Sequence, residues 1–322
     1  MPEDRLDKLL KRSSVDIHSV EAILQDIQSQ MQEPLRSMLK TSLHGGKRLR
    51  PALVMQSGQL FKMSRKRTHL LAAAVEVLHS ATLIHDDIVD NASLRRGRKT
   101  IQSIWSAGAT VLAGDYLLAH AVCLISQLEN PEVLKILAET LYTMSAGEID
   151  YHYSQKDRKR REVYFQSINA KTASLFAGSM EMVGVLAGAK KNMVSALTNF
   201  GRDFGIAYQI VDDVLDIVSD AKSLGKPVGS DLTQGIITLP VICYLERGRD
   251  DEVIKKILSG KGNRKDISVA IVMIRKSGAI EDALNEAKAH ARKCKAALSR
   301  LPNSRPRQAL HDLVDYVVER KH

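Results

Sequence analysis

Six aspartates occur in two pentads that share the same spacing. They are Asp86, Asp87, Asp90, Asp212, Asp213 and Asp216. In a helix, the spacing i, i+1, i+4 places the three carboxylates of each pentad on one face within a single turn. Carboxylates held that close repel one another unless a cation lies between them. Oxygen ligands of this kind suit Mg²⁺, which proteins usually hold through one or two carboxylates and the phosphates of a substrate. The pentads therefore predict a cavity with a metal-diphosphate site on two acidic walls.

The residues around each pentad help to decide whether it binds a metal or has no such function. Either pentad alone could be a solvated helix face or a cluster of helix N-caps. However, residues 83–84 and 88–89 flank the first pentad with Leu, Ile and Val, and residues 210–211 and 214–215 do the same for the second. Carboxylates are costly to bury among such side chains unless something positive holds them. The pair of pentads therefore favours metal binding over a solvated face.

Basic residues suited to phosphate lie on both sides of the first pentad. The turn at residues 45–51, Gly-Gly-Lys-Arg-Leu-Arg-Pro, places flexible glycines beside three cations, and Arg95-Arg96 begins five residues after Asp90. Glycines let a backbone approach a phosphate closely, and Lys and Arg neutralise it. The spacing is not that of a P-loop. For residues 45–51 the alternative is a basic turn without function. For Arg95-Arg96 the alternative is a pair of structural salt bridges.

Other polar residues lie in phase with the pentads, close behind the second pentad or within a separate apolar helix. They are His79, Lys171, Thr172, Gln209 and Lys226. His79 precedes Asp86 by seven residues, two helical turns along one stripe, although a lone His on an apolar face is usually a core residue. Lys171 interrupts an apolar helix, where a buried ammonium needs an anionic partner. These residues extend the predicted phosphate site.

The elements that must position these residues are predicted to be helices. Segments rich in Leu, Ala, Met, Glu, Lys and Gln, with apolar residues three or four apart, run between 8 prolines. Strand-like alternation bounded by hairpin turns is absent. No linker-like composition divides the 322 residues. The sequence therefore predicts an all-α fold with one domain over residues 1–322.

Composition excludes several other classes. The net charge of +10 invites a nucleic-acid interpretation, but the basic runs at 62–67 and 156–161 have no interleaved aromatics and fit solvated loops. The segment 70–90 is too polar for a membrane span. The chain opens without an apolar signal core, and Cys123, Cys243 and Cys294 have no metal-ligand spacing. We expect a cytoplasmic protein with reduced cysteines that binds no nucleic acid.

With these elements assembled, the chain resembles the trans-isoprenyl diphosphate synthases. The likeness extends from about residue 45 to 240 and follows the family's order of motifs: GGKRLRP, HSATLIHDDIVDNASLRRG, Gly114-Asp115, the Lys-Thr pair at 171–172, YQIVDDVLD and GKPVGSDL. The resemblance implies the isoprenoid synthase fold, a large helical bundle around a deep central cavity, usually as a homodimer. It also implies elongation of an allylic diphosphate with isopentenyl diphosphate, with about three Mg²⁺ ions per active site.

The resemblance assigns roles to individual residues. Positions matching those that hold isopentenyl diphosphate are Lys47, Arg50, His79 and Arg96. Positions matching the Mg²⁺ ligands are Asp86, Asp90 and Asp212, supported by Asp87, Asp213 and Asp216. Cations matching contacts of the allylic diphosphate are Arg95, Lys171 and Lys226, while Thr172 and Gln209 match positions near the developing carbocation. One departure is Ile236, where the family often has a second loop Lys.

Product length is expected to depend on the residues below the first pentad. Ala81 and Thr82 lie one turn deeper than Asp86 and are small, whereas short-chain members of the family carry a bulky aromatic there. We expect a tunnel for a product of about six to ten isoprene units (C30–C50), a precursor of quinone side chains. Candidates for its lower wall are Leu117, Leu118, Ala121 and Val122.

Several alternatives remain open from the sequence. Geranylgeranyl diphosphate is the second candidate product. A class I terpene cyclase normally carries Asn, Ser and Glu in its second metal motif. A non-catalytic subunit would be expected to lose metal ligands, and none is lost, whereas a binding protein leaves the aspartates unexplained. Because a long lipid product must be released, a peripheral membrane contact also remains possible. Whether a second subunit is needed is likewise open.

Overall fold

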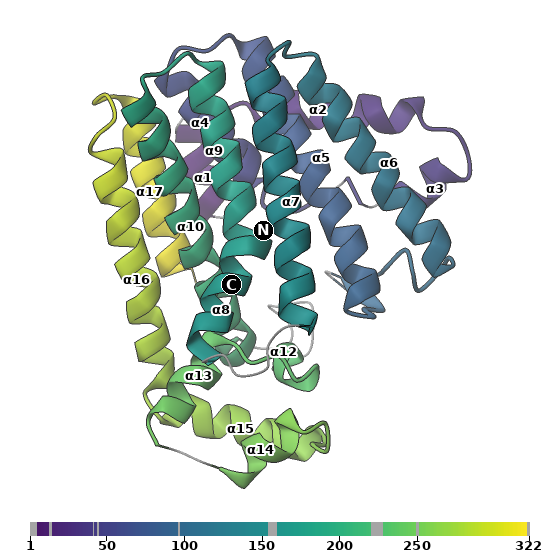
Figure 1. Cartoon of the computed structure of the whole chain (residues 1–322), viewed down its shortest axis with the longest axis vertical. Helices are drawn as coiled ribbons and strands as arrows, with labels where there is room; N and C mark the ends of the chain where they lie inside the picture. The colour runs from purple at the N-terminus through teal and green to yellow at the C-terminus, as the bar shows by residue number, and fades with distance from the viewer. Residues whose placement is uncertain are drawn as a thin grey trace. The chain divides into compact units, whose positions relative to one another are not determined.

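The computed structural model describes residues 5–12, 15–40, 42–43, 45–95, 97–153, 160–219, 228–248 and 251–320 (Figure 1). The chain divides into two compact units, each made of three stretches. Unit 1 comprises Met1–Leu141, Leu175–Gly201 and Lys295–Leu313; unit 2 comprises Tyr142–Ser174, Arg202–Cys294 and Val314–His322. The expectation of one domain over 1–322 stays a prediction beside this division.

Unit 1 contains the helices that precede and carry the first pentad. Its elements are α1 (Arg5–Arg12), α2 (Ile17–Gln30), α3 (Leu35–Leu39), α4 (Leu49–Leu60), α5 (Arg65–Val89), β1 (Leu94–Arg95), β2 (Arg98–Lys99), α6 (Ala107–Ser126), α9 (Ser174–Leu186, from Leu175 on) and the first parts of α7 (Pro131–Tyr153) and α10 (Lys191–Val218). It also holds the end of α16 (Ala279–Leu298) and most of α17 (Arg305–Glu319).

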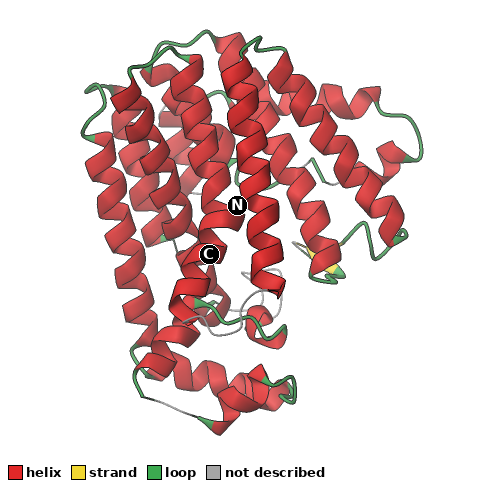
Figure 2. Cartoon of the chain, in the orientation of Figure 1, coloured by secondary structure: helices red, strands yellow, loops and turns green. Residues whose placement is uncertain are grey.

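Unit 2 contains the helices around the second pentad. Its elements are the remainder of α7 and α10, α8 (Arg160–Ile168), the π-helix η1 (Asn169–Ala173), α12 (Ser230–Thr233), α13 (Leu239–Glu246), α14 (Glu252–Leu258), α15 (Arg264–Lys276), most of α16 and the end of α17. Its hydrophobic core is formed by side chains of α8, α10, α13, α14, α15 and α16. The prediction of an all-α fold is confirmed, as Figure 2 shows for the described residues.

The helix α5 is the central element of unit 1. Ser64 caps its N-terminus by accepting a hydrogen bond from the Arg67 backbone N–H at 3.4 Å. The run that follows is Leu-, Ala- and Val-rich and is buried on most sides, because α2, α4 and α6 all pack against it. The last residues of the run are the first pentad, so the pentad is held at the end of a well-packed helix.

One small element differs from the sequence prediction. Leu94 pairs with Lys99 and Arg95 with Arg98 in an antiparallel hairpin of β1 and β2. Strands of two residues are too short to leave an alternating pattern, so the sequence carries no strand signal at this place. The hairpin carries Arg95, one of the predicted phosphate contacts.

Small residues bring helices of unit 1 close together. Gly178 on α9 lies against the Thr140 side chain of α7, and a Cβ at this position would overlap the Thr140 hydroxyl. The Gly- and Ala-rich composition of residues 174–189 therefore reflects close helix packing in this structure. Glu181, charged within the same helix, is half-buried, and burial raises its pKa above the usual range.

Candidate functional site

The first pentad does not present its three carboxylates equally. Asp86 and Asp90 are half-buried and lie one turn apart at the end of α5. Asp87 is buried, and its Oδ1 accepts a hydrogen bond from Nε of Arg95 at 2.7 Å. Burial raises the pKa of Asp87 despite the neighbouring Arg95. In this structure Asp86 and Asp90 are the accessible oxygen donors, while Asp87 anchors the hairpin that carries Arg95.

The dipeptide Gly114-Asp115 on α6 contacts His85, the residue immediately before the first pentad. On α6, Asp115 Oδ1 lies 3.4 Å from Nε2 of His85, and the same nitrogen lies 3.3 Å from the Val111 carbonyl oxygen. A Cβ at Gly114 would overlap the His85 ring. The glycine therefore lets α6 approach α5 at the turn that begins the first pentad.

Replacing Gly114 with Ala is expected to destabilise the protein by about 1–3 kcal/mol, because the added methyl group must push His85 or α6 aside. Urea unfolding measures the change. In a His85→Ala background the ring is absent, so the same substitution should cost much less. An equal cost in both backgrounds would show that this contact is not its cause.

Arg50 and His79 are brought together in unit 1. Nη1 of Arg50 lies 3.1 Å from Nε2 of His79, and the guanidinium stacks over the Phe176 ring at 4.3 Å. Lys47 precedes α4 and is half-buried. The structure thus groups two of the four residues predicted to hold isopentenyl diphosphate.

Arg48, the middle cation of the same turn, has a different environment. Its side chain is 6% exposed and donates to Glu21 Oε1 at 2.5 Å, to Glu76 Oε1 at 2.6 Å and to the Leu43 carbonyl at 2.6 Å. Three cations directed at phosphate is therefore the wrong interpretation of this turn. A buried cation needs such acceptors, and Arg48 ties the turn to α2 and α5.

The second pentad, on α10 in unit 2, is largely occupied by protein donors. Asp213 accepts from Tyr164 Oη at 2.7 Å and from Gln209 Nε2 at 2.8 Å, one bond to each carboxylate oxygen. Asp216 accepts from Ser230 Oγ at 2.9 Å and from the Asp231 backbone N–H at 3.2 Å. The two side chains are buried. They therefore fix α8, Gln209 and the start of α12, and a metal-binding role for Asp213 and Asp216 stays a prediction.

Burial also sets the protonation of this network. Burial raises the pKa of Asp213 well above its usual range, and Asp231 adds to the shift, while the donors Tyr164 and Gln209 oppose it. Burial, with the neighbouring Asp213 carboxylate, likewise raises the pKa of Tyr164, which remains a neutral donor. Asp212, in contrast, has a side chain that is 42% exposed and pairs with Arg320 at 2.5 Å. Asp212 is thus the accessible carboxylate of the second pentad.

Lys171 and Thr172 lie in the π-helical turn η1, a local widening of the helix that is common at functional sites. Lys171 is half-buried, and its Nζ bonds Oε1 of Glu148 at 3.0 Å, so the expected anionic partner is present. Thr172 Oγ1 donates to Gln209 Oε1 at 2.8 Å. The structure therefore joins Thr172, Gln209 and Asp213 in one chain of hydrogen bonds.

Three residues of this arrangement had not been predicted from the sequence. Tyr164 lies seven residues before Lys171, a two-turn spacing that could have revealed it. Glu148 and Arg320 carry no local signal, since their partners are distant in the chain. The predicted residues Arg96 and Lys226 lie outside the described residues. Ile236 is half-buried and donates its backbone N–H to the Asp231 carbonyl at 2.9 Å.

The residues expected to set product length lie on α5 and α6. Ala81 is 1% exposed, and Thr82 is half-buried with its hydroxyl bonded to the His79 carbonyl at 2.8 Å. Leu117 and Ala121 are buried, and Leu118 and Val122 are half-buried. These positions lie in or beside the core of unit 1, where a change of side-chain volume has consequences.

The donor set fits Mg²⁺ bound together with a substrate better than a closed protein cage. Among the described residues, no three His, Cys, Asp or Glu side chains are grouped so that they could hold a metal ion. In unit 1 the accessible carboxylates of the pentad are those of Asp86 and Asp90, and in unit 2 it is that of Asp212; all are hard oxygen donors. Mg²⁺ keeps several waters and is usually completed by phosphate oxygens, so few protein ligands suffice.

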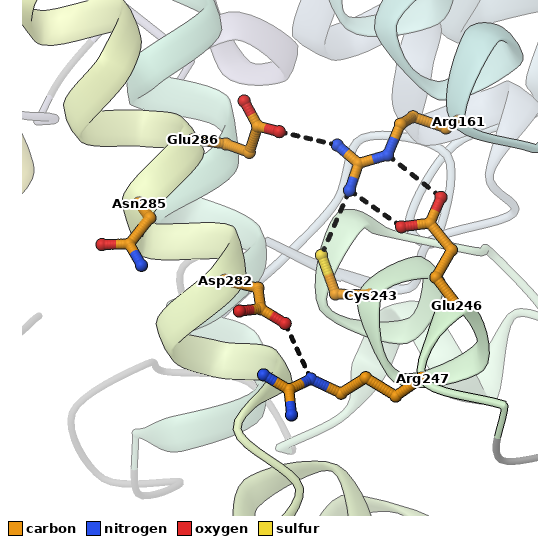
Figure 3. Close-up of a pocket in the computed structure, with 7 residues that line it drawn as sticks. All are labelled: Arg161, Cys243, Glu246, Arg247, Asp282, Asn285 and Glu286. Atoms are coloured by element: carbon orange, nitrogen blue, oxygen red, sulfur yellow. Dashed lines mark hydrogen bonds and ion pairs between the residues drawn. The ribbon is translucent and has the colours of Figure 1, made fainter.

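A cavity of about 470 Å³ in unit 2 contains none of these residues (Figure 3). Arg161 bonds Glu246 at 2.9 Å and Glu286 at 2.9 Å, and Arg247 bonds Asp282 at 2.7 Å. Burial raises the pKa of Cys243 there to about 11, so its thiol stays protonated. Each charge drawn has an opposite partner, which indicates a structural network that holds α8 to α13 and α16. Arg161 is therefore not the solvated residue expected of its basic run.

Comparisons with known proteins agree with this set of motifs. Residues 32–274 match the family model described as polyprenyl synthetase. Component 2 of heptaprenyl diphosphate synthase from Bacillus subtilis is 33% identical over 306 residues, covering 92% of this chain and 87% of the relative. Two solved structures are also similar over nearly the whole chain.

The first is a polyprenyl synthase from Caulobacter crescentus complexed with calcium and isoprenyl diphosphate. It has a TM-score of 0.92 and 33% identity and covers 100% of both chains. The second is geranylgeranyl pyrophosphate synthetase from Pyrococcus horikoshii, with a TM-score of 0.86 and 31% identity, covering 98% of this chain and 100% of the other. Prenyl diphosphate substrates and a divalent metal are consistent with such relatives. The chain is a prenyltransferase and belongs to the polyprenyl synthetase family, the trans-isoprenyl diphosphate synthases.

Proposed function

We propose that this enzyme adds isopentenyl diphosphate units to an allylic diphosphate and makes an all-trans polyprenyl diphosphate of about six to ten isoprene units for quinone side chains. The observation that carries the proposal is the pairing of α4 with α5. His79 precedes Asp86 on α5 by two helical turns, about 10 Å along the helix axis, and Arg50 on α4 lies beside His79. The two helices thus offer a cationic phosphate contact and an acidic metal contact at separate levels.

The proposed chemistry follows from charge and orientation. Mg²⁺ held by Asp86, Asp90 and Asp212 would supply positive charge to the leaving diphosphate. Arg95, Lys171 and Lys226 would stabilise the charge that develops when the allylic C–O bond breaks. Isopentenyl diphosphate, oriented by Lys47, Arg50, His79 and Arg96, then attacks the cation through its double bond.

Two polar groups would lie beside that cation. The hydroxyl of Thr172 and the amide oxygen of Gln209 are already joined by a hydrogen bond, and their dipoles would stabilise the positive carbon. Loss of a proton, with the released diphosphate as base, completes each five-carbon extension. Apolar walls would exclude water, which otherwise quenches the cation.

The function is tested by incubating the purified chain with isopentenyl and farnesyl diphosphates and Mg²⁺. We expect diphosphate release coupled to formation of a linear lipid diphosphate, and loss of both after EDTA treatment. A cyclic hydrocarbon would identify a terpene cyclase instead. If the chain binds the substrates without turnover, and a second protein restores turnover, the chain is one component of a two-subunit synthase. The name of the Bacillus relative, component 2, suggests this outcome.

Product length is tested with Ala81→Phe. Because Ala81 is buried one turn below Asp86, an aromatic ring there should close the tunnel and shorten the product to about C15–C20, as shown by reversed-phase chromatography. Ala81→Ser keeps the residue small and should leave the length unchanged. If Ala81→Phe folds, as judged by circular dichroism, and still makes the parental product, the tunnel lies elsewhere. A C20 product from the parent chain would favour the geranylgeranyl alternative.

We also propose a homodimer that covers the exposed face of α6. Among the described residues, α6 is the one helix long and apolar enough to cross a membrane by length and composition, and 39% of its apolar window is buried. Leu112 on α6 is 70% exposed and Val111 is exposed too, and Ile104 and Trp105, which lie just before the helix, are also exposed. An apolar face of this kind favours association, and two copies can pair through the same face.

The assembly is tested by light scattering during size-exclusion chromatography. Leu112→Glu should yield monomers, whereas Val272→Glu, at an exposed apolar position of α15, should leave the dimer intact. Flotation with liposomes examines the alternative that α6 contacts a membrane surface when a long lipid is released. The cytoplasmic location is likewise proposed; none of the three cysteines forms a disulfide, and cell fractionation is its test.

A further inference from the structure

Arg320, at the end of α17, has the most unusual environment of the basic residues in unit 2. Its side chain is only 3% exposed. One Nη atom donates to Asp212 Oδ1 at 2.5 Å and to the Tyr208 carbonyl at 2.9 Å, and the guanidinium stacks over the Tyr208 ring at 4.1 Å. Because Tyr208 and Asp212 are one turn apart on α10, Arg320 is fixed to a single turn of that helix.

The pairing is asymmetric. The guanidinium is buried, while the Asp212 side chain is 42% exposed. Nε of Arg320 has no acceptor among the described residues, so the Asp212 carboxylate is the main compensation for this buried charge. Without the Asp212 carboxylate, the buried Arg320 guanidinium would have no counter-charge in a poorly solvated environment. Arg320 is therefore expected to stay beside Asp212 when other ligands bind.

The remainder of the second pentad offers little to a metal. Both carboxylate oxygens of Asp213 and both of Asp216 already accept hydrogen bonds from the protein. Oδ2 of Asp212 has no donor among the described residues. Of the second pentad, this oxygen alone is thus left for a metal among the described contacts, and the charge of Asp212 is balanced by Arg320.

We propose that Arg320 is a positioning residue that orients and neutralises Asp212, so that the second pentad binds a divalent cation only together with a diphosphate. The inference rests on the proposed metal-binding role of Asp212 and deepens it. A half-exposed carboxylate beside a guanidinium attracts a dication weakly, because the two positive groups repel each other. A diphosphate adds several negative charges and oxygen ligands, which restore the attraction. Metal binding is then coupled to substrate binding.

The test uses Mn²⁺ as a paramagnetic probe and inorganic pyrophosphate as the diphosphate. Bound Mn²⁺ is titrated by electron paramagnetic resonance with the full chain, with and without pyrophosphate. Arg320→Gln removes the charge and should strengthen pyrophosphate-independent Mn²⁺ binding by about tenfold, the effect of one nearby unit charge. The enhancement caused by pyrophosphate should fall accordingly. Arg320→Lys keeps the charge and should stay within about twofold of the parent.

Asp212→Asn makes the inference and the proposed function distinguishable. In the Arg320→Gln background, Asp212→Asn should abolish the increase in pyrophosphate-independent Mn²⁺ affinity, since that increase depends on the Asp212 carboxylate. This double variant also leaves no buried guanidinium without a counter-charge. If Asp212→Asn removes no Mn²⁺ even with pyrophosphate, the metal role of Asp212 in the proposed function is wrong. If it removes one, but Arg320→Gln leaves Mn²⁺ affinity unchanged or weakens it in a folded protein, the inference about Arg320 alone is overturned.

Discussion

Asp86→Asn is expected to lower kcat by roughly a hundred- to a thousandfold, the loss typical of removing one group that stabilises developing charge. Asn has the shape of Asp but lacks the charge and one of the oxygen donors that Mg²⁺ requires. Because Asp86 is half-buried at the end of α5, the free energy of unfolding should change by no more than about 0.5 kcal/mol. Steady-state kinetics over a range of Mg²⁺ concentrations and urea unfolding measure the two effects.

Two further Asp→Asn variants serve as controls for this result. Asp26 lies on α2 and is exposed, with a hydrogen bond from Gln30, so Asp26→Asn should leave both kcat and stability unchanged. Asp87 is buried and bonds Arg95, so Asp87→Asn should lower stability as well as kcat. If Asp86→Asn retains the parental kcat and Mg²⁺ dependence, the first pentad is not a metal site.

The helical architecture and the polar motifs could be predicted because their signals are local. Apolar residues three or four apart define α5 and α10, and the pentads interrupt those runs within a single turn. Arg50 and His79 were assigned to the same substrate from separate segments, and the structure places them 3.1 Å apart. Local periodicity therefore carries much of the information about which helix presents which group.

The state of each carboxylate could not be predicted, because it depends on partners far away in the chain. Asp213 is 49 residues from Tyr164, and Asp212 is 108 residues from Arg320. Six aspartates with identical spacing thus fall into two groups. Asp86, Asp90 and Asp212 remain accessible, whereas Asp87, Asp213 and Asp216 are buried and bonded to protein donors. Spacing alone treats them alike, and burial separates them.

The turn at residues 45–51 shows the same limit for cations. Its three basic residues look equivalent in the sequence, but Arg48 has positive φ (48°) and its side chain is buried. Its acceptors Glu21 and Glu76 come from α2 and α5. The conformation of the turn follows from these long-range bonds, and Lys47 and Arg50 are positioned by it.

Arg48→Met is accordingly expected to lower the free energy of unfolding by about 3–5 kcal/mol, the cost of breaking a buried ion pair on one side. Met keeps the length of the aliphatic stem but leaves the carboxylate of the buried Glu76 without this donor. Since the turn then loses its attachment to α2 and α5, KM for isopentenyl diphosphate should rise more than kcat falls. Urea unfolding and initial-rate kinetics measure the two consequences.

The double variant Arg48→Met with Glu76→Leu tests the physical cause. Replacing both charges by apolar groups removes the uncompensated carboxylate, so most of the lost stability should return, while the raised KM should persist. Arg67→Met is the matched single control, because Arg67 is exposed and its side chain makes one bond among the described residues, to the Leu186 carbonyl at 3.3 Å. This variant should cost less than about 1 kcal/mol. If Arg48→Met is as stable as Arg67→Met, the buried network contributes little to the free energy of unfolding. If Arg48→Met keeps the parental KM for isopentenyl diphosphate, Lys47 and Arg50 are positioned by other contacts.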